Sequence, residues 1–227
     1  MIKKLIPNIF FNISSSYSWF DSFFYDQFIA PAAHEYMSRM DQLLTETPSG
    51  SHLLDVGCGG GHNLMSVIQT TTDIRITGLD LNPYQCQRVF NRTKQDRNRV
   101  NICQGNVLSL PFGDNVFDCV YSIGVIKHWP DHVQGVSECI RVLRPGGQLI
   151  IAEIDRGCSF QDAFHFIQQW RIPGFSRPIF LAFFRTWVAG QSIDLDEAKQ
   201  LMTHFSLSQC QIQKISNTPA LLIQGQK

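Results

Sequence analysis

Three closely spaced glycines directly follow a short apolar segment, and they constrain the fold of this chain more than any other feature. Residues 53–61 read Leu-Leu-Asp-Val-Gly-Cys-Gly-Gly-Gly, so that Gly57, Gly59 and Gly61 form a G-x-G-x-G run. Because glycine has no Cβ, this run permits a tight turn and lets a ligand approach the backbone and a helix N-terminus. A helical pattern follows from Gly60 to about Gln69. The segment therefore predicts a strand, a loop and a helix in succession.

Short apolar runs alternate with amphipathic segments over residues 50–155. The pattern predicts strands at 53–57, 75–81, 99–106, 117–123 and 148–154, separated by helices at 60–69, 83–96 and 131–143. Residues 209–215 and 220–226 flank a Ser-Asn-Thr-Pro turn and predict an antiparallel hairpin. We therefore expect an α/β, doubly wound, Rossmann-like sheet of seven mostly parallel strands.

Aromatic residues concentrate on both sides of this core. Of 26 aromatic residues, ten lie in 1–36 and nine in 156–190. We expect an N-terminal helical cap segment at 1–49, a core at 50–155, a cap insertion and helix at 156–207, and the hairpin at 208–227. One interpretation is that the aromatic segments only pack on the core. The other is that residues near 17–28 and 160–187 also roof a pocket at the carboxyl edge of the sheet.

Composition excludes several classes of protein. Hydrophobic residues make up 44% of the 227 residues, which is enough for a core, and 19 basic residues balance 19 acidic ones. A neutral chain has no overall positive field, so we expect no nucleic-acid partner unless a local basic patch forms. The seven cysteines include no C-x-x-C pair, which favours buried or half-buried free thiols in a reducing cytosol.

The first residues, MIKKLIPNIFFNISSS, imitate a signal peptide, but Pro7, Asn8 and Asn12 interrupt the apolar stretch. No apolar run approaches the roughly 18–20 residues of a transmembrane helix. We therefore expect a cytoplasmic protein without a transmembrane segment, and the start of the chain leaves room for peripheral membrane contact. The oligomeric state is not indicated by any of these patterns.

Two acidic residues narrow the ligand class. Asp80 ends the second predicted strand, 23 residues after Gly57, close to the spacing of a carboxylate that accepts from ribose hydroxyls. Asp55 stands immediately before the glycines, where its charge would repel a pyrophosphate. The same charge would help to hold a cationic amino-acid moiety. The pair therefore favours S-adenosylmethionine (SAM) over NAD.

Four segments carry a resemblance to a known family. They are LLDVGCGGG, GLDLNP, GNVLSLPFGDNVFDCVYSIGVIKHWPD and LRPGG. Together they resemble the class I SAM-dependent methyltransferases, and most of all the small-molecule branch that includes the ubiquinone and menaquinone C-methyltransferases. The resemblance is close over about 50–155 and extends loosely to the hairpin and to Tyr25-Asp26. These motifs are specific for SAM binding and poorly specific for the methyl acceptor.

The resemblance implies a set of cofactor contacts. Asp55 and the loop residues Gly57, Cys58, Gly59 and Gly61 would hold the methionine end of SAM. Asp80 would accept from the ribose hydroxyls, and Leu81 would pack on the adenine. The remaining implied contacts are Asn106 and Val107 at the adenine edge, and Ser122 and Ile123 on the sulfonium side. The family commonly has Asp where this chain has Asn106, whose amide oxygen could still accept, or which could serve only as a turn residue.

Methyl transfer from a sulfonium needs alignment, exclusion of water and, for some acceptors, a base; no metal-ligand spacing appears. His128, in IKHWPD after the fourth strand, is the best candidate for a general base, and its alternative role is to shape the loop. Tyr25, Glu153 and Asp155 are secondary candidates. We assign no catalytic role to the Glu138–Arg141 pair, which we expect to be a surface ion pair.

Three functions remain open from the sequence. The first is a SAM-dependent methyltransferase with a small apolar or aromatic acceptor. The second is a nucleic-acid or protein methyltransferase, against which the neutral charge counts. The third is a SAM-binding module without turnover.

Overall fold

Seven strands form one sheet in the computed structural model, which describes residues 43–44 and 47–227. The strands are β1 (His52–Val56), β2 (Arg75–Asp80), β3 (Val100–Gln104), β4 (Phe117–Ile123), β5 (Leu143–Ile154), β6 (Ser208–Lys214) and β7 (Ala220–Gln226). Their spatial order is β3-β2-β1-β4-β5-β7-β6, and only β7 runs antiparallel to its neighbours. The expected α/β sheet and its C-terminal hairpin are confirmed. The carboxyl ends of β1 to β5 share one edge, and the strand order reverses between β1 and β4 at that edge.

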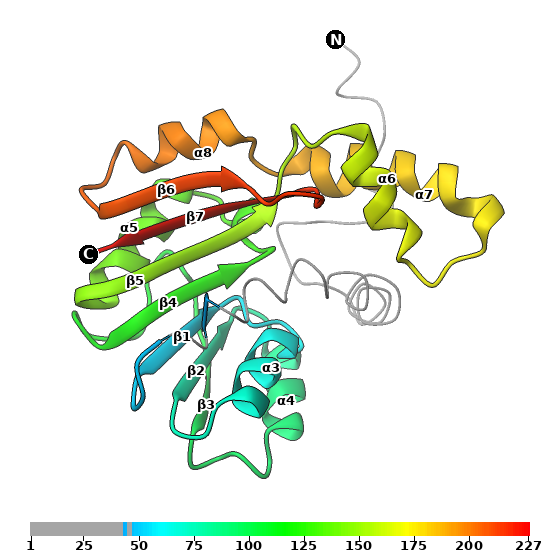
Figure 1. The fold of residues 1–227 in the computed structure, drawn as a ribbon. Coiled ribbons are helices and arrows are strands. Elements are labelled where there is room, and N and C mark those ends of the chain that lie inside the picture. Colours follow the sequence, from blue (N-terminus) through cyan, green and yellow to red (C-terminus); the bar gives the residue numbers. More distant parts are fainter. Residues whose placement is uncertain (1–42, 45–46) are drawn as a thin grey trace.

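Two layers of helices cover the sheet. Helices α3 (His62–Thr70) and α4 (Pro83–Arg92) pack on one face, and α5 (His132–Val142) and α8 (Leu195–Met202) pack on the other (Figure 1). Two apolar clusters form the core, the first between the sheet and helices α3 and α4, the second between the sheet and helices α5 and α8. Successive strand residues point to opposite faces, so Leu53 belongs to the first core cluster and Leu54 to the second. Both residues are fully buried, as expected for strands that are covered on both faces.

Local signals set most helix starts. The Asn82 side chain accepts from the backbone N–H of Tyr84 at 2.9 Å, with Pro83 in the first helical position of α4. Asp131 caps α5 in the same way through Gln134 N–H. Asp194 and Glu197 form a complete capping box on α8.

Two boundaries differ from the predicted ones. Helix α4 ends at Arg92 rather than near Asp96, because the cap residue Thr93 leaves helical geometry at φ −97° and ψ 22°. The chain then turns, with the Asp96 N–H donating to the Thr93 carbonyl at 3.0 Å. Helix α5 ends at Val142, and β5 begins at Leu143, five residues before the predicted strand. The Pro-Gly-Gly segment is therefore part of β5, where backbone bonds to Lys227 hold it.

Residues 156–193, called the insertion below, leave the carboxyl end of β5 and return before α8. They contain α6 (Phe160–Gln168), α7 (Arg177–Phe183) and a π-helical turn (Phe184–Val188). The N–H of Arg156 donates to the Ile193 carbonyl at 3.1 Å, which closes the two ends of the insertion on each other. Figure 1 shows α6 and α7 projecting beyond the carboxyl ends of the strands.

The insertion has its own apolar cluster. Its buried members include Ala163, Phe166, Ile167, Trp170, Leu181 and Phe184. Phe160 and Phe164 lie at the edge of this cluster, because Phe160 is 65% exposed and Phe164 is only partly buried. The face of α6 that packs carries Ala163, Phe166 and Ile167. Phe166 lies edge to face with Trp170, which follows the helix, with centroids 6.0 Å apart.

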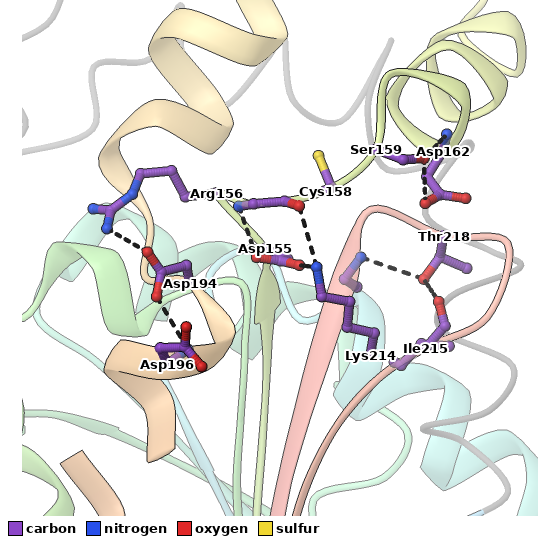
Figure 2. A network of polar contacts seen from close by, with 12 residues as sticks. Asp155, Arg156, Cys158, Ser159, Asp162, Asp194, Asp196, Lys214, Ile215 and Thr218 are labelled. Carbon is purple, nitrogen blue, oxygen red and sulfur yellow. Dashed lines mark hydrogen bonds and ion pairs between the residues drawn. The ribbon is translucent and has the colours of Figure 1, made fainter. Parts of the chain in front are cut away.

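A polar network fixes the insertion to the sheet (Figure 2). Asp155, which is 1% exposed, accepts from Gly157 N–H at 2.7 Å and pairs with Lys214 of β6 at 2.6 Å. Arg156 pairs with Asp194 at 2.7 Å and also with Glu197, which ties the start of the insertion to α8. Asp155 thus serves as an anchor of the chain, which accounts for its buried carboxylate without a catalytic role.

The seven cysteines are free thiols, of which four are buried and two half-buried. Cys210 departs from the expectation because it is exposed on β6, the edge strand. Within residues 43–44 and 47–227, no helix combines the length and the apolar character needed to cross a bilayer. Tyr25 and the 17–28 part of the expected roof lie outside the described residues.

Candidate functional site

The glycine loop joins β1 to α3 at the carboxyl edge of the sheet, and each of its three spaced glycines has positive φ. A Cβ on Gly57 would lie 2.5 Å from Val125 Cγ1, and one on Gly61 would lie 2.9 Å from Val89 Cγ1. These two glycines are therefore required by packing. A Cβ on Gly59, at φ +50°, would meet nothing within 4 Å. The space at Gly59 is thus open, as a loop that receives a ligand requires.

Backbone hydrogen bonds fix the loop against β2. The N–H groups of Gly57 and Cys58 donate to the Leu79 carbonyl at 2.7 and 3.0 Å. The N–H of Gly59 donates to Asp80 Oδ2 at 2.9 Å. The Cys58 side chain is buried, and burial raises the pKa of its thiol well above the ordinary value. Cys58 therefore contributes its backbone to the loop, while its side chain packs in the core.

Asp55 is a buried carboxyl group without a satisfied partner. It is 1% exposed, and neither side-chain oxygen has a hydrogen-bond partner among the described residues. Tyr121 lies opposite Asp55 on the neighbouring strand β4. Burial raises the Asp55 pKa to about 8, and the Tyr121 hydroxyl opposes only part of that rise. A buried carboxyl group needs donors for several acceptor positions, and the Tyr121 hydroxyl can fill only one of them. An ammonium group, with three N–H donors and a positive charge, fits that requirement.

Asp55→Asn should separate the effect of the Asp55 carboxyl group on protein stability from its effect on SAM binding. The raised pKa means that the folded protein disfavours the carboxylate, so stability is lost as pH rises from the unfolded value toward 8. Ligand-free Asp55→Asn should therefore have a higher Tm than the parent chain at about pH 8, and a smaller advantage at about pH 5.

The same substitution should weaken SAM binding. In the parent chain, an ammonium favours the charged carboxylate, so the Kd should tighten as pH rises from about 6 to about 8, and Asp55→Asn should remove most of that dependence. Calorimetry in two buffers of different ionisation enthalpy measures the released proton. A variant that binds SAM as the parent does at every pH would contradict the role of Asp55.

Asp80 lies at the end of β2, next to the glycine loop. Its two oxygens accept from Asn82 N–H at 2.8 Å and from Gly59 N–H at 2.9 Å. Burial raises its pKa, and these two backbone donors oppose that shift. A carboxylate offers about four acceptor positions, so two remain for the hydroxyls of a ribose. Leu81 follows directly and is 63% exposed, which leaves an apolar surface beside Asp80.

Asn106 forms the turn that follows β3. Its Oδ1 accepts from Leu108 N–H at 2.9 Å, and Asn106 itself is exposed. Asn106 therefore serves as a turn residue, as the alternative interpretation expected. One lone pair of its amide oxygen stays available for an adenine amino group. Val107 is buried, with 9% exposed, and closes the loop against the second core cluster.

Glu138 and Arg141 of α5 do more than the expected surface pair. Glu138 accepts from Leu110 N–H at 2.7 Å, and Arg141 donates to the carbonyls of Leu110 and Phe112. Arg141 also pairs with Glu138 and Asp114, each at 2.7 Å. These bonds hold the loop after Asn106 in place, which is a structural role.

Ser122 and Ile123 end β4. The Ser122 hydroxyl donates to the Val56 carbonyl at 2.9 Å, so its side chain links β4 to β1 rather than pointing to a ligand. Ile123 is 9% exposed and belongs to the first core cluster. Both therefore reach the candidate site through backbone position at the strand end.

His128 lies in a short 3-10 helix, Ile126–His128, that follows β4 at the carboxyl edge. Burial, assisted by the charge of Lys127, lowers its pKa to about 3. The imidazole is therefore neutral at physiological pH and is a weak base. This electrostatic setting favours the loop-shaping alternative over general-base catalysis.

Lys127 and Glu153 form a buried pair that no sequence pattern indicated. Lys127 Nζ donates to Glu153 Oε1 at 2.8 Å and to the Gly124 carbonyl at 2.8 Å, and the Glu153 side chain is fully buried. Glu153 also accepts from the backbone N–H of Lys127 and of Ile154. The carboxylate is engaged on both oxygens, so it positions the loop that carries His128.

A shallow groove of about 350 Å³ lies between the start of α5 and α8. Its lining includes His132, His204 and Glu197 but none of the predicted site residues. In the described part of the chain, no group of three or more His, Cys, Asp or Glu side chains is arranged to hold a metal ion. The groove therefore lies apart from the predicted site residues.

Residues 54–151 match the family described as Methyltransferase domain. The chain is 38% identical over 119 residues to an O-methyltransferase of Pyrenophora dematioidea, which covers 50% of this chain and 44% of that protein. It is 33% identical over 141 residues to the sterol 24-C-methyltransferase erg6 of Aspergillus fumigatus, covering 58% and 36%. The chain thus spans less than half the length of each of these two curated relatives.

The fold also matches solved structures. A SAM-dependent methyltransferase structure from Methanococcus maripaludis superposes with a TM-score of 0.70 at 19% identity, covering 94% of this chain and 96% of that one. This likeness supports the fold alone. The methyltransferase family match covers residues 54–151, the part of the chain that contains the glycine loop, Asp80 and His128.

Proposed function

We propose that this chain binds SAM at the carboxyl edge of β1 and β2 and transfers its methyl group to a small apolar or aromatic acceptor. The observation that carries the proposal is the unsatisfied, buried Asp55 carboxyl in the strand that leads to the open space at Gly59. Asp80, with acceptor capacity to spare, ends the next strand. A loop with a carboxylate at its base suits a cationic amino-acid group and would repel a pyrophosphate.

Each proposed contact residue would bind a different chemical group of SAM. Asp55 would pair with the ammonium, Asp80 would accept from the ribose hydroxyls, and Leu81 would pack on the adenine. Asn106 and Val107 would meet the adenine edge. The backbone at Ser122 and Ile123 would lie on the sulfonium side.

Bound SAM would supply a methyl group on a leaving group that is already activated. The task of the chain is then to align the acceptor and exclude water. The Lys127–Glu153 pair holds the loop after β4, and His128 presents a neutral ring from that loop. Tyr25 remains a proposed contributor from outside the described residues.

The acceptor class is inferred from two lines of support. The relatives named above methylate oxygen or sterol carbon by their names, and the insertion adds an aromatic cluster at the carboxyl edge. An aromatic roof would exclude water and favour a flat or lipid-like acceptor.

A methyl-transfer assay with the full chain tests this function. Release of S-adenosylhomocysteine is followed with phenols, hydroquinones and sterols in one series and with RNA and basic protein in another. We expect release only in the first series. Release only with RNA or protein would overturn the acceptor class, and SAM binding without release in either series would favour the SAM-binding module.

His128→Ala should have a small effect on turnover. Because its pKa is about 3, the wild-type rate should show no inflection from His128 near neutral pH, and the variant should lose less than about tenfold in kcat. His132→Ala, on the adjacent turn, is the matched control. A loss of about 10²–10⁴-fold with unchanged SAM affinity would contradict this and restore His128 as the general base.

A further inference from the structure

The connection between α6 and α7, together with the first turn of α7, exposes large apolar side chains at the far end of the insertion. Phe175 is 87% exposed and Ile179 is 72% exposed. Figure 1 shows this connection as the part of the insertion that projects away from the sheet. Phe166, Trp170 and Phe184 already fill the cluster beneath it. Phe175 and Ile179 are therefore surplus to the packing of the insertion.

The charge around these side chains has one sign. Residues 163–193 contain Arg171, Arg177 and Arg185 but no Asp or Glu, although the whole chain is neutral. Arg171 and Arg177 bracket Phe175 in sequence, and Arg171 is exposed. Arg185 lies nearer the base, where it donates to the Cys158 carbonyl at 3.2 Å. The segment is thus both apolar and cationic at its exposed end.

We propose that this end of the insertion docks on an anionic lipid bilayer surface. Phenylalanine and isoleucine on a projecting turn can enter the boundary between headgroups and acyl chains. Arginine side chains beside them can extend to lipid phosphates, and each basic residue near an anionic leaflet adds attraction. An acidic lipid surface complements a segment that has three arginines and no acid.

The position of the docking surface links it to the site. The insertion leaves β5 at the same edge as the glycine loop, and the Asp155 and Arg156 network fixes it there. Docking would hold that edge near a phase that dissolves apolar molecules. The membrane contact itself does not depend on the proposed function. Its use in presenting an acceptor does depend on that function.

Co-sedimentation with vesicles tests the contact without SAM or acceptor. The full chain is mixed with vesicles of phosphatidylcholine alone, or of phosphatidylcholine with phosphatidylglycerol. We expect binding to the anionic vesicles that weakens with added salt. Phe175→Ser with Ile179→Ser should weaken it about tenfold or more, and Arg171→Glu should weaken it about fivefold or more.

Two control variants lie elsewhere. Phe90→Ser removes an exposed phenylalanine from α4, and Arg75→Glu reverses a charge at the amino end of β2. Both should bind vesicles as the parent does.

Failure to bind anionic vesicles, or equal losses in the controls, would overturn the proposal. Self-association that Phe175→Ser abolishes, in the absence of vesicle binding, would instead make this surface a protein interface. Intact SAM binding in the same variants keeps either failure separate from that of the proposed function.

Discussion

Gly59→Asn should abolish SAM binding while the protein stays folded. A side chain at this position enters the space that a Cβ would reach without meeting any atom within 4 Å, which is where we place the ligand. Asparagine tolerates the left-handed conformation that Gly59 adopts at φ +50°, so the backbone should keep its path. We expect the Kd to rise by more than about a hundredfold, because a filled site leaves no room for the close backbone approach that glycine permits.

Gly50→Asn is the matched control for that variant. Gly50 also has positive φ, and a Cβ added there would also meet nothing within 4 Å, but it precedes β1 at the opposite edge of the sheet. Its SAM affinity should equal that of the parent. Calorimetry measures the Kd, and the thermal transition checks the fold. Normal binding by Gly59→Asn would show that the loop is only structural. Valine at Gly59 is less informative, since a β-branched residue at this φ adds strain.

Asp80→Ala should produce the second large loss. It removes one or two charged hydrogen bonds to the ribose, each worth roughly 1.5–3 kcal/mol, so we expect the Kd to rise at least about tenfold. The variant also removes the hydrogen bond from the Gly59 N–H to Asp80 Oδ2, which is 2.9 Å long, and this loosens the loop that receives the ligand. Both effects act on binding in the same direction.

Asp118→Ala separates a site effect from a general one. Asp118 of β4 likewise accepts from a backbone N–H, that of His52, at 2.8 Å and pairs with Arg144. It lies at the amino end of the parallel strands, away from the glycine loop. Its loss should lower stability and leave SAM affinity unchanged. Equal affinity of Asp80→Ala and the parent would remove Asp80 from the proposed site.

The sheet and the glycine loop could be predicted because their signals are local. The apolar run before Gly57 and the alternation of strands and helices follow from short-range pattern, and the hairpin follows from its Ser-Asn-Thr-Pro turn. Asp80 could be found because the spacing from a glycine loop to the end of the next strand is nearly fixed in such folds.

Features that depend on register or on burial could not be predicted in the same way. Tyr121 faces Asp55 because β1 and β4 pair in a particular register, which no local pattern encodes. The Lys127–Glu153 pair joins the 3-10 helix after β4 to the end of β5, which are neighbours only in the folded protein. The aromatic content of residues 156–190 could be read from the sequence, but which of those rings are buried depends on tertiary contacts such as that between Trp170 and Phe184.

The most direct measurement of the central claim is a calorimetric titration of the full chain with SAM and, separately, with NAD. Both ligands suit a glycine loop after a first strand, and the buried Asp55 carboxyl is the feature that distinguishes them. We expect one SAM bound per chain, with proton release at neutral pH, and no heat of binding from NAD. Binding of NAD without binding of SAM would contradict it.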